Sequence, residues 1–323
     1  MCTAITYRTK DHYFGRNLDL EYSYQEAVTV TPRNYPFIFR KVPEISNHFA
    51  MIGMALVIDE YPLYYDATNE CGLSMAGLNF PGNAVYQSFK TNADNITPFE
   101  FIPWILSQCK TVDHAKKLLK RLNLLDVSFS VEYPLSPLHW IISDQEKSIT
   151  VEPMSDGLKI FDNPVGVLTN NPPFDYHMHN LKNYLNLTRE PPENRLAPDI
   201  DLTPYSRGMG AIGLPGDLSS ASRFIKAAFT KLNSLSSDSE SESISQFFHI
   251  LGSVAQQRGC VKVGNGYEKT VYSSCCNTDK GIYYYTTYEN SQITGVNMHQ
   301  IDLDGHKPVG YPLVVTQQIR MEN

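Results

Sequence analysis

The second residue of the chain, Cys2, carries the side chain best suited to act as a nucleophile. If Met1 is removed, a thiol and a free α-amino group belong to one residue, so the amine can take the thiol proton directly or through a water. An α-amino group has an ordinary pKa of about 8, well below about 10.4 for lysine, and part of it is a neutral base near pH 7. Cysteine is also the strongest nucleophile among the hydroxyl and thiol side chains. A chain can begin with Met-Cys by chance, so other residues must support such a site.

Arg16 and Asp19, in residues 14–19 (FGRNLD), are the next candidates. Arg16 can hold a thiolate or orient Asp19, and Asp19 can accept a hydrogen bond from an N-terminal ammonium. Side chains alternate between the two faces of a strand, so positions 16 and 19 point in opposite directions. They serve one site only if the strand ends near Asn17. An ion pair on the surface is the alternative explanation.

Two asparagines and a further arginine complete the polar candidates. Asn79 ends a strand in the turn 77–81 (GLNFP), and Asn170 lies in residues 168–172 (LTNNP). Such residues can donate N–H groups to an oxyanion, and one such donor is worth about 3–4 kcal/mol in other hydrolases. Arg223 falls in the first turn of an expected helix, where the helix dipole disfavours a cation, which indicates a specific partner. Turn asparagines before proline and a surface arginine are the simple alternatives.

The bulk composition is that of a globular protein with no sign of nucleic-acid binding. The 323 residues are 42% hydrophobic, with a net charge of −7 and no long basic patch. No apolar run approaches the ~20 residues of a membrane helix, and residues 1–10 lack the features of a secretory signal. The six cysteines show no CxxC spacing, so we expect most of them to be buried thiols rather than disulfides or a metal site. These features predict a cytoplasmic location without membrane insertion.

Strand-like and helix-like segments alternate in blocks along the chain. Short apolar and β-branched runs predict strands in the first third, and a turn at residues 69–72 predicts a strand pair over 66–78. A capping box (TPFE) predicts a helix over 99–108, and apolar spacing predicts another over 112–122. Strands at 138–143, 148–152 and 158–161 precede an irregular stretch, 172–215. Helices over 222–232 and 244–256 and a final hairpin follow, so the layers can stack as helix–sheet–sheet–helix.

Taken together, the motifs resemble those of the choloylglycine hydrolases, the family of bile-salt hydrolases and penicillin V acylases among the N-terminal-nucleophile (Ntn) hydrolases. Matching segments follow one another in order along almost the whole chain. They are MCT at 1–3, FGRNLD at 14–19, AGLNFP at 76–81, LHW at 138–140, VLTN at 167–170, GLPGD at 213–217, ASRF at 221–224 and YYY at 283–285.

The resemblance implies an α+β fold, a four-layer αββα sandwich of two antiparallel sheets flanked by helices. It implies one domain over residues 1–323 with Met1 removed, usually assembled as a homotetramer. It also implies that Cys2 is the nucleophile and that its amine is the base, with no metal or cofactor. By motif, Arg16 and Asp19 flank the nucleophile, Asn79 and Asn170 support the oxyanion and the amine, and Arg223 completes the polar cluster.

Within the family, asparagine at the position of Asn79 accompanies bile-salt cleavage and tyrosine accompanies penicillin V cleavage. The resemblance therefore implies conjugated bile salts, the glycine or taurine amides of bile acids, as substrates. A steroid needs an open apolar groove, for which the aromatic stretches 58–65 and 127–138 are suited. Simple packing under loops is the alternative for these side chains. The candidate substrate-binding residues are Leu18, Tyr22, Tyr24, Ile58, Tyr65, Ala67, Phe129, Tyr133 and Leu138.

Three other interpretations remain open at this stage. The first is a penicillin V acylase with the same mechanism and a smaller acyl group. The second is a hydrolase that uses an internal pair such as Cys109 with His139. The third, from a different class, is a non-catalytic bile-acid binding protein.

Overall fold

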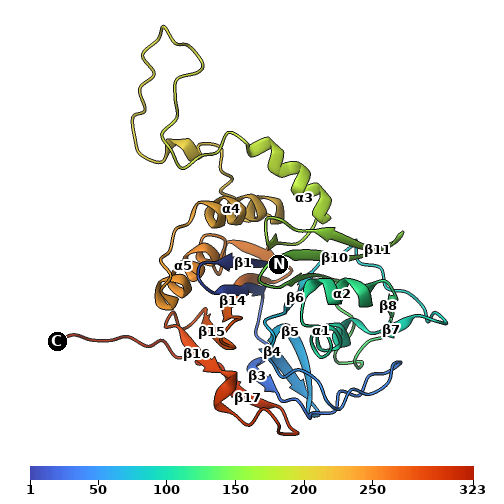
Figure 1. The fold of residues 1–323 in the computed structure, drawn as a ribbon. Helices are drawn as coiled ribbons and strands as arrows, with labels where there is room; N and C mark the ends of the chain where they lie inside the picture. Colours follow the sequence, from blue (N-terminus) through green and yellow to red (C-terminus); the bar gives the residue numbers. More distant parts are fainter.

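The computed structural model describes residues 1–323, and two large antiparallel sheets form its centre (Figure 1). The first sheet contains the N-terminal strand, and its central strand is the long β14. In spatial order its strands are β12 (Val167–Leu168), β1 (Cys2–Arg8), β2 (His12–Leu20), β14 (Gly266–Asn277), β15 (Ile282–Thr287) and β16 (Thr294–Asn297), with β13 (Val261–Val263) paired to β14.

The second sheet has eight strands and stacks face to face with the first. In spatial order they are β11 (Gly157–Asp162), β10 (Ser148–Met154), β9 (Leu138–Ser143), β6 (Ser74–Asn79), β5 (Tyr61–Asn69), β4 (Met51–Ile58), β3 (Ala27–Thr31) and β17 (Val309–Pro312). A small parallel pair, β7 (Asp94–Ile96) and β8 (Leu122–Leu124), lies apart from both sheets.

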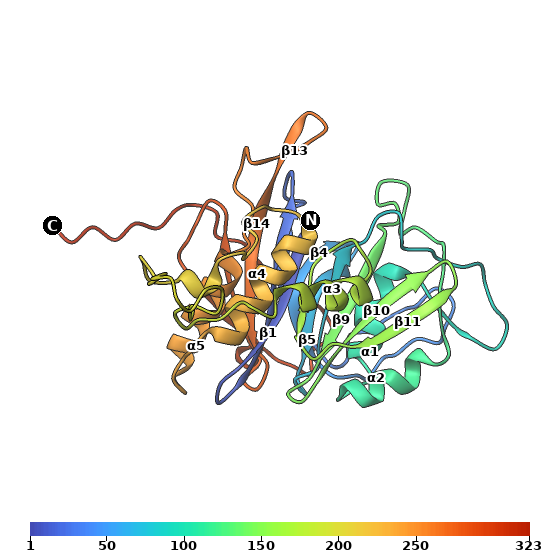
Figure 2. The same cartoon turned by 90° about the horizontal axis from the view of Figure 1, so that it is seen from above.

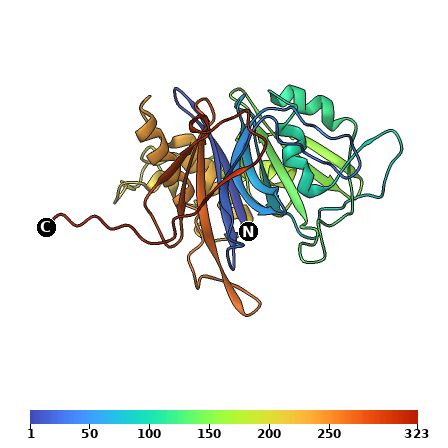
Figure 3. The same cartoon turned by 90° about the horizontal axis from the view of Figure 1, so that it is seen from below.

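Helices cover the outer faces of both sheets. Helices α4 (Ser220–Asn233) and α5 (Glu240–Gly252) pack on the first sheet, and α1 (Phe101–Leu106) packs on the second, with α2 (Val112–Leu119) beside it. Figures 2 and 3 show the two sheets between these helical layers. The expected four-layer αββα sandwich is therefore confirmed. None of the helices has both the length and the apolar character needed to span a bilayer.

Two apolar clusters fill the spaces between the layers. The larger lies between the sheets and beneath α4 and α5, and it includes Cys2, Phe14 and Phe224. The smaller lies between the second sheet and α1 and α2, where Trp140 contacts Phe101 edge to face. Cys2 thus begins a strand that is buried in the larger core.

The expected turn between β5 and β6 is confirmed at residues 69–72. The Asn69 side chain accepts hydrogen bonds from the N–H groups of Cys71 and Leu73, both at 3.1 Å. Gly72 has a φ of +85°, a conformation that favours glycine. Local side-chain chemistry therefore fixes this turn, as the sequence predicts.

Three expectations about elements are wrong in part. The stretch 172–215 is not irregular throughout, because it contains α3 (Phe174–Leu181), which packs against α4. The helix expected over 99–108 is shorter, a 3₁₀ turn (Pro98–Glu100) followed by α1. The central strand β14 has no counterpart among the expected strands. It carries several polar residues at buried positions, which hide the alternation typical of a strand.

We expect Phe14→Ala to lower the free energy of unfolding by about 3–5 kcal/mol, because the removed ring leaves a cavity between the two sheets. Urea titration of the purified protein measures this change. Val131→Ala is the control, since Val131 is 92% exposed and its truncation should change stability by less than ~0.5 kcal/mol. Equal stabilities of the Phe14 variant and the parent would contradict the described core.

Candidate active site

The register between β1 and β2 decides which groups surround Cys2. Cys2 lies opposite Leu18, and Ala4 lies opposite Arg16. Residues directly opposite in an antiparallel pair share a face, so the thiol and Arg16 both face the second sheet. Asn17 faces the helices instead, and its side chain donates to a carbonyl of α5 at 2.9 Å.

Arg16 is fully buried beside the thiol. Its Nη1 donates to the carbonyl oxygens of Gly77, at 2.5 Å, and Tyr65, at 3.0 Å, so the second sheet holds the guanidinium in place. The guanidinium lies within interaction distance of the Cys2 side chain, and its Nη2 has no hydrogen-bond partner. A buried donor without a partner is costly. This one is available to a thiolate or to a bound ligand.

A second polar group lies on the helix side of Cys2 and contacts its backbone. The Cys2 nitrogen donates to Asn170 Oδ1 at 2.8 Å, and Arg223 Nη2 donates to the same oxygen at 2.7 Å. Arg223 Nη1 donates to the Cys2 carbonyl and to Thr3 Oγ1, both at 2.6 Å. Asp19 Oδ2 lies 3.9 Å from the same nitrogen. The first strand is therefore anchored at its very start.

Asn79 joins this group through its backbone. It is the last residue of β6, its carbonyl accepts from Asn170 Nδ2 at 2.7 Å, and it lines the cavity that contains Cys2. The structure thus brings together all six polar residues singled out in the sequence. They are Cys2, Arg16, Asp19, Asn79, Asn170 and Arg223.

The expectation that the second strand must end near Asn17 is wrong, since β2 continues to Leu20. Arg16 and Asp19 do point to opposite faces, as strand parity requires. Arg16 interacts with the thiol, which projects toward the second sheet. Asp19 lies on the helix side, 3.9 Å from the Arg223 nitrogen that donates to the Cys2 carbonyl. Cys2 therefore has polar neighbours on both faces of the first sheet.

Burial dominates the electrostatics of the helix-side group. Asp19 is fully buried, and this burial raises the pKa of its carboxyl while Arg223 acts in the opposite direction. The carboxylate also accepts from Thr270 Oγ1 at 2.6 Å. In the unprocessed chain the Met1 amine donates to the Asp19 carbonyl at 2.8 Å and pairs with Glu268, and burial lowers the pKa of this amine. While Met1 is present, the Cys2 nitrogen is an amide.

The backbone of Asn170 is held from two further elements. Ser220, the first residue of α4, accepts from the Asn170 N–H at 2.8 Å. His177 of α3 donates from Nε2 to the Asn170 carbonyl at 2.9 Å and stacks on Phe224 with ring centroids 4.7 Å apart. Neither residue is among the candidates predicted from the sequence. His177 lies in the stretch expected to be irregular, and a serine at a helix start carries no signal beyond capping.

His139 bonds to Thr169, the residue before Asn170, rather than to a cysteine. Its Nε2 donates to the Thr169 carbonyl at 3.0 Å, and its Nδ1 lies 2.9 Å from Glu152 Oε1. Glu152 also accepts from the Phe174 N–H, which begins α3. Burial raises the pKa of Cys109 to about 12, and the contacts of His139 do not include this thiol. The geometry therefore does not support a Cys109–His139 pair.

A cavity of about 370 Å³ opens at the Cys2 thiol, and most of its wall is apolar. Arg16 and Asn79 are among its few polar lining residues close to the thiol. Six of the candidate substrate-binding residues line it, namely Leu18, Tyr24, Tyr65, Phe129, Tyr133 and Leu138. Lining residues that the sequence analysis did not single out for binding include Leu20, Leu56, Phe99, Ile102, Leu135 and Trp140.

Three candidate substrate-binding residues lie outside this wall. Tyr22 is exposed, and its hydroxyl lies 3.0 Å from that of Tyr24. Ile58 ends β4 and does not reach the cavity. Ala67 belongs to the smaller core, on the face of the second sheet that α1 covers. Neighbouring strand residues point to opposite faces, so an aromatic-rich stretch does not by itself tell which side chains face a ligand.

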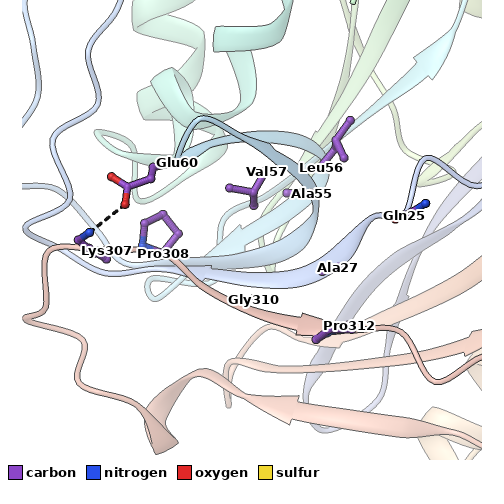
Figure 4. A pocket seen from close by; sticks show the side chains of 10 residues that line it. All are labelled: Gln25, Ala27, Ala55, Leu56, Val57, Glu60, Lys307, Pro308, Gly310 and Pro312. Atoms are coloured by element: carbon purple, nitrogen blue, oxygen red, sulfur yellow. Dashed lines mark hydrogen bonds and ion pairs between the residues drawn. The ribbon is translucent and has the colours of Figure 1, made fainter.

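A second cavity, of about 310 Å³, lies between β3, β4 and the segment that leads into β17 (Figure 4). An ion pair of 2.8 Å joins Lys307 and Glu60 at one end of it. Its lining includes no cysteine, no histidine and no member of the polar group around Cys2. The chemistry of the chain therefore points to the cavity at Cys2.

Comparison with known proteins agrees with this geometry. Residues 2–311 match the model of the linear amide C–N hydrolases, choloylglycine hydrolase family. The chain is 57% identical to a bile salt hydrolase/transferase of Lactiplantibacillus plantarum, over 97% of both chains. It superposes on a mutant conjugated bile acid hydrolase of Clostridium perfringens with a TM-score of 0.92, at 38% identity over the full length of both chains. A penicillin V acylase of Agrobacterium tumefaciens, at 17% identity over 95% of this chain and 90% of that one, shares the fold with a TM-score of 0.77.

The histidine that holds Asn170 predicts a loss of stability in acid. Burial lowers the pKa of His177 from 6.5 to about 4, so the unfolded chain takes up a proton near pH 6.5 while the folded chain stays neutral there. The free energy of unfolding therefore does not depend on this residue's protonation above pH 6.5. It decreases as the pH falls from 6.5 toward 4, by up to ~3 kcal/mol. Urea titrations between pH 7 and pH 4.5 measure this slope.

His177→Gln should flatten the slope, although His12, whose pKa burial also lowers to about 4, keeps part of it. Val131→Ala provides the control, because it replaces an exposed side chain without a titratable group and should leave the slope unchanged. An unaltered slope in the His177 variant would show that this residue is not buried as a neutral ring.

Proposed function

Since the chain belongs to the choloylglycine hydrolase family of linear amide C–N hydrolases, we propose that it hydrolyses the amide bond between a bile acid and glycine or taurine. One observation carries the proposal. Cys2 begins a buried strand with its thiol in the wall of an apolar cavity and its nitrogen bonded to Asn170. The names of relatives at 57% and 41% identity, both bile salt hydrolase/transferase, support the choice of substrate.

The first chemical step requires removal of Met1, which frees the α-amino group of Cys2. The neutral amine takes the thiol proton, and the thiolate beside Arg16 attacks the amide carbonyl. Asn79 lines the cavity next to the thiol and supports the oxyanion that forms. Asn170 Oδ1 accepts from the amine and keeps it oriented toward the thiol.

The second step breaks the C–N bond. The protonated amine of Cys2 gives its proton to the departing nitrogen, which leaves as free glycine or taurine, and a thioester to Cys2 remains. Water, activated by the same amine, then attacks the thioester carbonyl. Bile acid is released and the thiol is restored, so the cycle consumes only water.

The cavity supports a large, flat acyl group. Leu18 and Leu20 extend from the strand beside Cys2, and Phe129 and Leu135 face the same space from the loop before β9. Apolar walls with few polar groups near the reacting atoms are typical of sites that bury most of a ligand. A penicillin V acylase remains the alternative enzyme, and a non-catalytic bile-acid binding protein the alternative from another class. The complete polar group around Cys2 favours catalysis over binding alone.

We propose further that the protein assembles as a homotetramer in the cytoplasm. The segment after α3 projects from the molecule (Figure 1) and exposes large apolar side chains, among them Leu196 and Tyr205. Such surfaces are typical of sites that another protein surface covers. A reducing compartment supports the proposal because it keeps the Cys2 thiol free. Light scattering of the purified protein tests the assembly.

We expect mature protein to release glycine from glycocholate faster than it cleaves penicillin V, and Cys2→Ala to abolish both activities. A form that keeps one extra, uncleaved residue before Cys2 should lose at least ~10³-fold in kcat, because its Cys2 nitrogen is an amide and cannot act as base. Intact mass verifies each N-terminus.

Cys71→Ala is the control for thiol loss, since Cys71 is exposed and does not line the cavity. It should keep full activity. Undiminished turnover by the extended form would overturn the proposed mechanism.

A change in the apolar wall should act on binding. Phe129→Ala removes a ring that faces the cavity, and we expect KM for glycocholate to rise about tenfold with a smaller change in kcat. Val131→Ala, two residues away on the same loop but exposed, should leave both constants unchanged. Steady-state kinetics measure both constants. Equal KM values for the two variants would contradict the placement of Phe129 in the substrate-binding wall.

A further inference from the structure

A buried carboxylate without a part in the mechanism above lies between the two sheets. Asp66 of β5 is only 1% exposed. Tyr272 and Tyr283 each donate a hydroxyl to it at 2.7 Å, and Ser274 donates at 3.4 Å. All three donors belong to the first sheet, so Asp66 is a polar link between the sheets inside the larger apolar core.

The positive charge that accompanies Asp66 is Arg16. The Tyr65 carbonyl, one residue before Asp66, accepts from Arg16 Nη1, and Ser274 Oγ accepts from the Arg16 N–H at 3.1 Å. Ser274 therefore contacts both residues. The two charges interact through the low-dielectric interior rather than by a direct ion pair, and attraction of this kind is screened little by solvent.

We propose that Asp66 is a positioning residue that balances the charge of Arg16 and thereby sets how readily the Cys2 thiol ionises. This inference rests on the proposed function only in taking Cys2 as the reactive thiol. With Asp66 ionised, the Arg16–Asp66 pair is neutral overall, and Arg16 attracts a thiolate only moderately. Without that carboxylate, the whole charge of Arg16 acts on the sulfur.

The charged and titratable groups on every side give the sign of the effect. On the helix side of Cys2, Arg223 and Asp19 offset each other, and the nearest titratable group is the α-amine of Cys2 itself. None of these groups is altered by a substitution of Asp66. Around Asp66 itself, the first sheet supplies Arg16, the two tyrosines and Cys276, whose pKa burial raises to about 12, so it stays a thiol. Burial raises the pKa of the Asp66 carboxyl, and Arg16 with the hydroxyl donors opposes that rise.

The pH dependence of Cys2 alkylation tests the proposal without requiring turnover. Mature protein is treated with iodoacetamide from pH 5 to pH 9.5, and the rate is followed on the N-terminal peptide by mass spectrometry, since other cysteines are present. Asp66→Asn should lower the midpoint for Cys2 by about one pH unit, a tenfold change in the thiolate-to-thiol ratio. At saturating pH the rate should fall slightly, because a less basic thiolate is a weaker nucleophile.

Glu100→Gln is the matched control. Glu100 is as deeply buried as Asp66, but it lies at the start of α1 and accepts from the backbone of Thr97 and Arg40. The same loss of a carboxylate there should leave the Cys2 midpoint within about 0.2 units of the parent. A merely structural effect of Asp66 would lower the melting temperature of its variant without moving the midpoint, and that result would overturn the proposal.

A second variant covers the case in which Asp66→Asn does not fold. Tyr272→Phe with Tyr283→Phe removes two donors from the carboxylate, favours its protonated form and should move the midpoint in the same direction by a smaller amount. An unchanged or raised midpoint in this variant would also overturn the proposal. Failure of the parent to hydrolyse glycocholate would count against the proposed function and leave the alkylation result to stand separately.

Discussion

The structure depends on fixing Cys2, the first residue of β1, as firmly as a residue in the middle of a strand. Chain ends are poorly ordered unless they are tied down, and Cys2 is tied down by a strand on one side and by Asn170 and Arg223 on the other. Arg223 comes from a helix, and Asn170 lies two residues after the end of a short strand far along the chain. Segments that are far apart in the sequence therefore act together to fix the backbone of Cys2.

Buried charge is the second constraint, because each ionised group in the interior needs compensation. Arg223 and Asp19 offset each other on the helix side of β1 and β2, and Arg16 and Asp66 do so between the sheets. The two pairs are separated by the first sheet itself. The groups that contact the Cys2 backbone therefore lie on one face of that sheet, and the guanidinium beside its thiol lies on the other.

The sequence predicts the chemistry of the site better than the elements that support it. Cys2, Arg16, Asp19, Asn79, Asn170 and Arg223 stand in motifs and come together as the resemblance implies. Strand β14 was missed because its buried positions hold residues such as Thr270 and Ser274, which bond to Asp19 and Asp66 rather than pack as apolar side chains. Helix α3 was missed for the same reason, since His177 occupies a buried position on it.

Residues that serve a buried site through their polar groups therefore weaken the very periodicity that reveals strands and helices. The same reasoning explains why the substrate wall was predicted only in part. Leu18 shares the face of Cys2 and lines the cavity, as strand parity requires. Tyr65 also lines it although Ala67, two residues on, belongs to the other face of the second sheet, because a bulge at Tyr65 interrupts the alternation. The orientation of the wall's loop residues, such as Phe129, follows from packing between segments distant in sequence, for which a single chain carries no periodic signal.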